Sequence, residues 1–198
     1  MLKLYWWPKT RAQRAIWMIE ETGADYELLP LDIDDPVARA DPAFRAVSPL
    51  GKLPALLYDG GGLADSAAIG LWLADRFPEA GLAPAVEDPR RGRYLWWMVF
   101  TTGVIEPAVA EKLGGWPASP RRNGWGDYDS MLGALEQGLA QGPWLLGERF
   151  TMADVMIGST LHFFRQFGIL PENPLLHAYA DRCVARPAFQ RALAREAG

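Results

Sequence analysis

Cysteine is nearly absent from this chain of 198 residues, in which Cys183 is the single example. One thiol cannot form an internal disulfide, a C-x-x-C redox motif or a thiolate zinc cluster, so cysteine-rich secreted scaffolds are excluded. Histidine is almost as scarce. His162 and His177 lack metal-ligand spacing to each other and to carboxylates, and we therefore expect both to be structural and no metal to be bound.

An excess of positive charge and long apolar runs are also lacking. The chain has 20 Lys and Arg residues against 24 Asp and Glu residues, which gives a net charge of −4. This balance argues against a nucleic-acid partner, because a nucleic-acid-binding face needs cations to neutralise phosphates. Polar residues interrupt the longest apolar stretch, 94–109, and the N-terminus has no signal-peptide pattern. We therefore expect a cytoplasmic protein with no membrane partner.

The first part of the chain, residues 1–78, alternates strand and helix patterns. Runs of β-prone residues predict strands at 2–6, 26–31, 54–58 and 62–63. Apolar residues at 3–4 spacing predict helices at 10–22, near 43–45 and at 65–77. Pro30 marks the second strand as an edge strand, and Asp59-Gly60-Gly61 is typical of a hairpin turn. The order β-α-β-α-β-β-α predicts a small α/β domain.

Strand patterns end at Pro78, and the second part of the chain is helical. Residues 79–89 are mostly small or proline, as expected of a linker. Apolar periodicity then predicts helices at 90–112, 127–141, 151–167, 175–184 and from 187 onward. Gly103 and Pro107 should bend the first of these. The expected organisation is an α/β domain over 1–78, a linker over 79–89 and an all-α domain over 90–198.

The segment Ser48–Leu56 and the residues that follow it carry the clearest chemical pattern. A cis bond before Pro54 would turn the backbone N–H and C=O of Leu53 outward, ready to pair with an extended peptide. Asp65 can accept a hydrogen bond from an ammonium group, while Ser66 and the start of its helix can hold a carboxylate. Together these groups fit the α-amino-acid end of a small peptide. The alternative is a strand-edge proline followed by an ordinary helix cap.

A second motif lies at the start of a predicted helix in the helical part. Thr151 and Asp154 form a T-x-x-D capping box, and Phe150 with Val155 completes a hydrophobic staple. We therefore expect Asp154 to be structural and not a catalytic acid.

In their order along the chain, these motifs resemble those of the cytosolic glutathione S-transferases. The matching segments are LY and PKTR within 4–11, RAIWMIEE (14–21), SPLGKLPAL (48–56), DSAAI (65–69), GERFTMAD (147–154) and ARPAF (185–189). The resemblance covers essentially the whole chain. It implies a thioredoxin-like N-terminal domain that binds glutathione, an α-helical C-terminal domain that carries the acceptor-substrate site, and a homodimer.

The resemblance also implies roles for individual residues. Leu53 would pair with the cysteinyl backbone of glutathione, while Asp65 and Ser66 would hold its γ-glutamyl end. Lys52 and Pro54 complete the expected glutathione-binding set. Many family members have glutamate at the position of Asp65, which keeps the charge.

Glutathione transfer requires a thiolate, and three side chains are candidates for stabilising it. Thr10 occupies the position at which members with a Pro-Arg-Ser-Arg loop use a serine hydroxyl, and it is the first choice. Arg11 is the second, through its charge, and Tyr5 is the third, since some branches of the family use a tyrosine. The alternatives are a helix cap for Thr10, a solvated arginine and a packed strand tyrosine.

The nine tryptophans raise the question of the second substrate. We expect Trp7, Phe100 and either Trp96 or Trp97 to line an acceptor pocket. Only one of the two tryptophans is expected there, because adjacent helical residues point about 100° apart. The alternative is that these rings belong to the core. The expected function is conjugation of the glutathione thiolate to a small apolar electrophile. Glutathione-dependent isomerisation, disulfide reduction, and non-catalytic binding of glutathione or another ligand remain alternatives. Because Cys183 lies far from this region in sequence, the reactive sulfur must come from the ligand.

Overall fold

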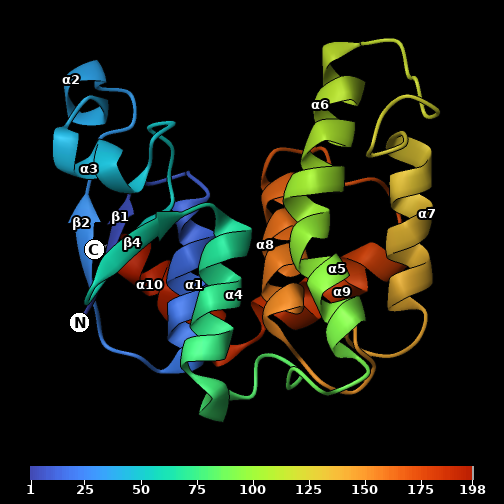
Figure 1. Cartoon of the computed structure of the whole chain (residues 1–198). Helices are drawn as coiled ribbons and strands as arrows, with labels where there is room; N and C mark the ends of the chain where they lie inside the picture. Colours follow the sequence, from blue (N-terminus) through green and yellow to red (C-terminus); the bar gives the residue numbers. More distant parts are fainter. Residues whose placement is uncertain (198) are drawn as a thin grey trace. The chain divides into compact units, whose positions relative to one another are not determined.

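The computed structural model describes residues 1–197, and side chains as far as Arg195. The chain divides into two compact units (Figure 1). Unit 1 contains Met1–Leu82 and the chain from Ala185 onward, and unit 2 contains Ala83–Val184. The sequence instead assigned everything from residue 90 to the helical domain, so the last helix differs from the expectation.

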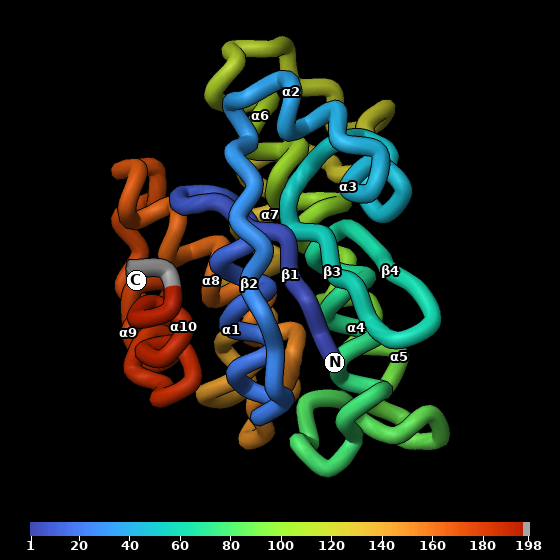
Figure 2. Tube along the Cα trace, turned by 90° about the vertical axis from the view of Figure 1, so that its left-hand side faces the viewer, coloured from blue at the N-terminus to red at the C-terminus, as the bar shows by residue number. Residues whose placement is uncertain are grey.

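Unit 1 is built on a mixed four-stranded sheet, whose strands follow one another in the order β2-β1-β3-β4 (Figure 2). The strands are β1 (Leu2–Trp6), β2 (Tyr26–Pro30), β3 (Ala55–Tyr58) and β4 (Gly61–Ala64). β1 pairs with β2 in parallel, and the other two pairs are antiparallel. β2 lies at the edge of the sheet, as Pro30 predicted, and the hairpin turn consists of Asp59 and Gly60.

Three helices of unit 1 pack together. They are α1 (Ala12–Thr22), α4 (Ser66–Arg76) and α10 (Pro187–Ala197). α1 contacts both of the others, and its apolar face is fully buried. The Glu21 carboxylate of α1 accepts hydrogen bonds from both Nε and Nη2 of Arg186, at 2.6 and 2.7 Å, and from the Trp17 indole at 2.8 Å. This ion pair and the packing on α1 explain why α10 belongs to unit 1, which sequence periodicity cannot show.

Two short helices, α2 (Pro36–Arg39) and α3 (Pro42–Val47), connect β2 to β3. Each begins with proline after an aspartate whose side chain accepts a backbone N–H: Asp35 caps α2 and Asp41 caps α3. The sequence predicted α3 only, because α2 is a single turn inside an acidic stretch without apolar periodicity. A 3-10 turn, η1 (Pro78–Ala80), follows α4.

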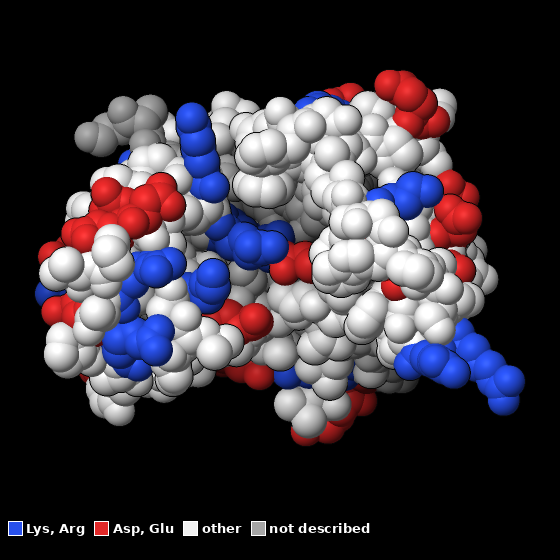
Figure 3. Space-filling model, turned by 90° about the horizontal axis from the view of Figure 1, so that it is seen from above, with Lys and Arg blue, Asp and Glu red and all other residues white. Residues whose placement is uncertain are grey.

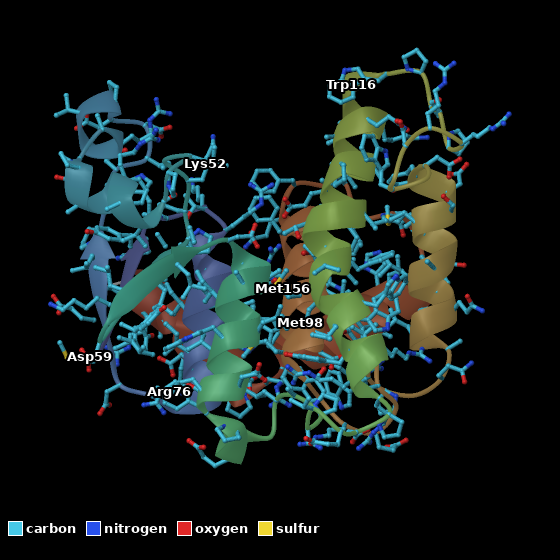
Figure 4. All side chains as sticks on the ribbon, in the orientation of Figure 1. Lys52, Asp59, Arg76, Met98, Trp116 and Met156 are labelled. Carbon is cyan, nitrogen blue, oxygen red and sulfur yellow. The ribbon has the colours of Figure 1, made fainter. Side chains whose placement is uncertain are left out.

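Unit 2 is helical throughout its regular elements. It contains α5 (Arg91–Phe100), the π-helical segment η2 (Thr101–Ile105), α6 (Glu106–Gly114), α7 (Tyr128–Leu139), α8 (Met152–Gln166) and α9 (Pro174–Val184). The predicted bend of the first long helix takes the form of η2, which contains Gly103. α8 is the buried helix of the unit; its Met156 and Met98 of α5 are both fully buried (Figure 4). Within the described chain, no helix is long and apolar enough to cross a membrane.

Asp154 anchors the start of α8, as predicted. Its carboxylate is fully buried and accepts hydrogen bonds from the backbone N–H of Leu145 at 2.9 Å, the N–H of Thr151 at 2.8 Å and the hydroxyl of Tyr179 at 2.9 Å. Burial raises the pKa of Asp154 to about 6, although these hydrogen bonds act in the opposite direction. Asp154 therefore ties together the preceding loop, α8 and α9.

Candidate functional site

The strand register brings three segments of unit 1 to one end of its sheet. Ala55, the first residue of β3, lies opposite Tyr5 of β1 on one side and Ala64 of β4 on the other. The loop after β1, the residues just before β3 and the residue just after β4 therefore meet at this end. In Figure 4, Lys52 lies at this end of the unit and Asp59, in the β3–β4 turn, at the opposite end. Most of the predicted site residues belong to these three segments.

Leu53 presents an unused backbone donor and acceptor at this end of the sheet. The Leu53–Pro54 peptide is cis, as the sequence suggested. Neither the N–H nor the C=O of Leu53 has a hydrogen-bond partner among the residues described. An extended peptide beside Leu53 can satisfy both groups in the manner of an added strand.

Ser48 holds the loop that leads to Leu53, and sequence reasoning gave it no role. Its hydroxyl, 1% exposed, donates to the C=O of Lys52 at 2.7 Å and accepts from the N–H of Lys52 at 2.9 Å. Gly51 completes the turn with a φ of 62°, a conformation that favours glycine. The serine of the motif could have indicated this role, because serine hydroxyls often form hydrogen bonds with nearby backbone groups.

Asp65 and Ser66 lie at the start of α4, as predicted, and each keeps a group available. Oδ1 of Asp65 accepts from the N–H of Ala67 at 2.8 Å, so Asp65 is indeed the helix cap. Oδ2 of Asp65 and the hydroxyl of Ser66 have no protein partner in the part of the chain that the structure describes. Capping and ligand binding are thus compatible here, because the cap uses only one of the two carboxylate oxygens.

Thr10 lies in the loop between β1 and α1, with its hydroxyl already engaged. The hydroxyl donates to the C=O of Trp7 at 2.7 Å, and its oxygen accepts from the N–H of Ala12 at 3.2 Å. Arg11, the next residue, is exposed. Lys9 before it has a φ of 59°; among the described residues, only Lys9 and Asp65 (φ 80°) are non-glycine residues with positive φ. Such backbone strain is concentrated at functional sites in proteins, and both examples lie in segments that meet at this end of the sheet.

Tyr5 is held on the face of β1 that meets α3. Its ring packs edge-to-face on Phe44 at a centroid distance of 5.2 Å. Partial burial, together with the charge of Asp41, raises the pKa of the Tyr5 hydroxyl. Neighbouring strand residues point to opposite faces, and the buried Leu4 and Trp6 flank Tyr5. These contacts account for Tyr5 as a packed strand residue.

A cationic hollow of about 380 Å³ lies between α2 and the Ser48–Lys52 loop. Arg39, Arg45 and Lys52 line it, and no carboxylate does. None of the three has an ion-pair partner within the described residues. Figure 3 shows several Lys and Arg side chains (blue) on the left-hand part of the surface, interspersed with Asp and Glu side chains (red). The hollow can therefore accept an anion, and sequence reasoning missed its two arginines because nothing in the local pattern places them beside Lys52.

The predicted acceptor-pocket residues belong to different units: Trp7, half-buried, to unit 1, and the others to α5 of unit 2. The rings of Trp96, Trp97 and Phe100 form one cluster, with centroid distances between 4.6 and 5.0 Å. Trp96 is 48% exposed and Trp97 only 2%, so the two residues lie on different sides of α5 as expected, although both rings reach the same hollow beside α7. The indole rings are large enough to meet edge to face at 4.6 Å, although the two side chains leave the helix about 100° apart.

Comparison with known proteins identifies the family. Residues 10–76 match the family model described as glutathione S-transferase, N-terminal domain, and residues 106–182 match the corresponding C-terminal domain. A maleylacetoacetate isomerase of Pseudomonas aeruginosa is 32% identical over 96% of this chain and 95% of its own length. The chain belongs to the glutathione S-transferase family.

Further relatives show the range of this family. The disulfide-bond oxidoreductase YfcG of Escherichia coli is 27% identical to this glutathione S-transferase family member, over 98% of this chain and 94% of the relative. A sphingomonad glutathione S-transferase solved in complex with glutathione is 32% identical, over 98% of each chain, with a TM-score of 0.79. The two-part architecture expected from the sequence, with a thioredoxin-like first part and a helical second part, is thereby confirmed.

This glutathione S-transferase family member has no thiol of its own to offer at the site. Cys183 is fully buried in unit 2, and its Sγ lies 4.0 Å from the carbonyl oxygen of Asp154. The described residues contain no group of His, Cys, Asp and Glu side chains that could hold a metal ion.

Proposed function

We propose that the chain is a glutathione transferase that binds glutathione at the end of the unit 1 sheet. The observation that carries this proposal is the unpaired backbone of Leu53, beside the uncommitted oxygen of Asp65 and the unpaired hydroxyl of Ser66. Leu53 pairs with the cysteinyl residue of glutathione. Asp65 takes the γ-glutamyl ammonium, and Ser66 with the first turn of α4 takes the γ-glutamyl carboxylate.

The second carboxylate of glutathione, on its glycyl residue, binds in the cationic hollow, where the side chains have the opposite charge. Lys52 precedes Leu53 directly, and Arg39 and Arg45 line the same hollow. An unpaired guanidinium can bind a carboxylate through two parallel hydrogen bonds. All charged ends of the tripeptide are then matched by residues of unit 1.

Thr10 stabilises the thiolate of the bound glutathione, and Arg11 adds positive charge at the same loop. A free thiol titrates near 8.5, and lowering its pKa by two units needs roughly 2.7 kcal/mol of preferential thiolate stabilisation. A hydroxyl donor supplies about 1.5–3 kcal/mol, and the start of α1 adds about 0.3–1 kcal/mol. The thiolate then attacks the electrophilic carbon, a carbon–sulfur bond forms, and the leaving group departs with the bonding electron pair. Trp7 supplies apolar surface for the electrophile.

Isomerisation and disulfide reduction are the second candidate activities, because two relatives have the names of such enzymes. The same thiolate can add to an activated double bond and leave again after rotation about the former double bond, or attack a disulfide sulfur and expel a thiolate. Both reactions use the glutathione site described above. They differ from conjugation only in the acceptor.

We further propose that the chain works as a homodimer in the cytoplasm, as the family resemblance implies. Leu95 and Val99 of α5 support this proposal, since they are 39% and 49% exposed on one side of that helix. Apolar side chains gathered on a helix face commonly mark a protein–protein contact.

Calorimetry with glutathione, followed by turnover assays, tests the proposal. We expect saturable binding of glutathione at one site per chain, and turnover with at least one member of a panel of aryl halides, activated alkenes and glutathione mixed disulfides. Absence of glutathione binding would refute the function altogether. Binding without turnover of any acceptor would instead establish a non-catalytic glutathione-binding protein.

Replacement of Asp65 by asparagine is expected to raise the Kd for glutathione about ten-fold or more, because a charge-assisted hydrogen bond to the ammonium is lost. Asparagine caps helices as well as aspartate does, so the fold should be preserved. Calorimetric titration measures the effect. The matched control is Asp127→Asn, which makes the same change at the cap of α7 and should leave the Kd unchanged. Equal affinity in wild type and Asp65→Asn would contradict the role of Asp65.

A further inference from the structure

The cationic hollow of unit 1 has more positive charge and more space than the glycyl carboxylate of glutathione requires. Its volume is about 380 Å³. Its lining combines three cations with three apolar residues and a glycine: Arg39, Arg45, Lys52, Pro36, Ala40, Leu50 and Gly51. The glycyl residue has no side chain and a single negative charge. Bound glutathione would therefore leave two of the three cations without a counter-charge and much of the hollow to water.

Arg45 reaches the hollow from α3 by passing over Gly51. A Cβ placed on Gly51 would collide with Nη1 of Arg45 and would lie 3.6 Å from the carbonyl oxygen of Arg39. Gly51 is itself buried, and Lys52 follows it directly. The guanidinium of Arg45 is therefore close both to the end of α2 and to the loop that leads into β3. The absence of a side chain at Gly51 is what allows this approach.

The nearest acidic residues in the sequence do not line the hollow. Asp35 precedes α2 and Asp41 precedes α3. Oδ1 of Asp35 accepts from the N–H of Val37 at 2.8 Å, and Oδ1 of Asp41 accepts from the N–H of Phe44 at 2.9 Å. Both carboxylates are thus engaged as helix caps, and the cations of the hollow form no ion pair within the described chain. An anion in the hollow meets positively charged side chains at its walls.

The direction of the bound peptide brings its third residue to this hollow. In the proposed function the γ-glutamyl end lies at the start of α4, and the cysteinyl residue pairs with Leu53. The residue after the cysteine then lies beside Lys52, which directly precedes Leu53. Arg39 and Arg45, in the two short helices, remain available for a side chain on that third residue.

From these features we infer that the chain selects γ-glutamyl-cysteinyl tripeptides whose third residue is acidic, with glutamate preferred to glycine. This inference rests on the proposed function, because it concerns the same site. Lys52 binds the main-chain carboxylate of the third residue. Arg39 and Arg45 bind its side-chain carboxylate, since a guanidinium group can bind a carboxylate through two parallel hydrogen bonds. The methylene groups of the glutamyl side chain lie against the apolar wall at Pro36 and Ala40.

Calorimetric titration of the full chain with four tripeptides tests this selectivity. The probes are glutathione and its analogues with glutamate, glutamine or lysine as the third residue. At low ionic strength we expect the glutamyl analogue to bind about five-fold more tightly than glutathione and than the glutaminyl analogue, which has the same shape without the charge. The lysyl analogue should bind more weakly than the glutaminyl one. Salt at about 0.5 M should reduce these differences to less than about two-fold, because it screens exposed charges.

Two substitutions assign the preference to the hollow. Arg45→Glu should reverse it, so that the lysyl analogue binds more tightly than the glutamyl analogue. Arg39→Gln should reduce the ratio of the glutamyl to the glutaminyl affinity to less than about two-fold. The matched control is Arg121→Gln, at an exposed arginine of unit 2, which should leave every ratio unchanged. Each comparison is made between peptides on one variant, so a general loss of stability does not alter the ratios.

Failure of this inference and failure of the proposed function give different results. If none of the four tripeptides binds, glutathione binding itself is refuted. If glutathione binds and the glutamyl analogue binds no more tightly than the glutaminyl analogue, the selectivity is overturned while the proposed function stands. A glutamyl preference that persists unchanged in both Arg39→Gln and Arg45→Glu would also overturn the inference, because other cations would then recognise the third residue.

Discussion

Replacement of Asp154 by alanine is expected to lower the free energy of unfolding by about 4 kcal/mol, the largest effect of any single substitution considered for this chain. The carboxylate accepts from the N–H groups of Leu145 and Thr151 and from the hydroxyl of Tyr179. The Thr151 hydroxyl also donates to this carboxylate, at 3.1 Å. Alanine leaves all four donors without this acceptor, and each unsatisfied buried donor costs roughly 1–3 kcal/mol. Denaturant unfolding followed by circular dichroism measures the difference.

Two controls separate this network from a general sensitivity of unit 2. Tyr179→Phe removes one of the donors together with its bond and should lower the free energy of unfolding by only about 1 kcal/mol. Asp129→Ala, at an exposed position in the first turn of α7, should change it by less than about 0.5 kcal/mol. If Asp154→Ala were as stable as Asp129→Ala, the capping network would not hold α8 in place.

The raised pKa of Asp154 gives the stability a defined pH dependence. Folding raises the pKa of the Asp154 carboxyl from about 3.9 in the unfolded chain to about 6. At pH values between these two, the carboxyl is protonated in the folded state and ionised in the unfolded state. The stabilisation due to this protonation is fully present below about pH 4 and is lost as the pH rises through about 6. We therefore expect the free energy of unfolding of the wild type to fall, relative to that of Asp154→Asn, between these pH values. A constant difference would contradict the shift.

Replacement of Thr10 by alanine is expected to lower kcat/KM for conjugation roughly ten- to hundred-fold. This loss corresponds to about 1.5–3 kcal/mol for a hydrogen bond to a charged group, at about 1.4 kcal/mol per factor of ten. The Thr10 oxygen is held by the N–H of Ala12, while its hydroxyl donates to the C=O of Trp7. Only the O–H bond has to turn for Thr10 to donate to the thiolate, so the oxygen is positioned in advance.

The conservative variant Thr10→Ser keeps the hydroxyl and should retain activity within about three-fold, because serine differs only in its freer rotamer. The pKa of the bound glutathione thiol, followed by the ultraviolet absorbance of the thiolate against pH, gives a second measurement. It should rise in Thr10→Ala and stay near the wild-type value in Thr10→Ser. Full activity of Thr10→Ala, together with loss of activity in Arg11→Ala, would transfer the role to the arginine.

Local sequence patterns predicted most of the elements of this fold. β1 spans the predicted residues 2–6, and the helices that carry apolar residues at 3–4 spacing begin and end within a few residues of their predicted bounds. α2 escaped prediction because a single turn of helix leaves no periodicity to detect. η2 was foreseen only as a bend, since glycine and proline indicate an interruption of a helix but not the hydrogen-bond pattern that replaces it.

The candidate site was predictable where one short segment contains both the backbone feature and the side chain. Asp65 with Ser66, and Leu53 with Pro54, are such segments, and within the described residues both keep polar groups without a protein partner. The cationic hollow was not predictable in the same way. Arg39 and Arg45 lie beside Lys52 only because two short helices fold the chain back toward the start of β3.

The sequence by itself determined the order of the main elements, the capping box of α8 and the absence of a second thiol, because each depends on residue type and near-neighbour spacing. Tertiary structure decided which unit α10 joins, which face Tyr5 occupies and where the ring of Trp97 lies. Each of these depends on contacts between residues far apart in the chain, such as Glu21 with Arg186, Tyr5 with Phe44 and Trp97 with Gly138. Local residue spacing does not reveal such contacts, because the packing energy of two surfaces depends on how both are arranged in the folded chain.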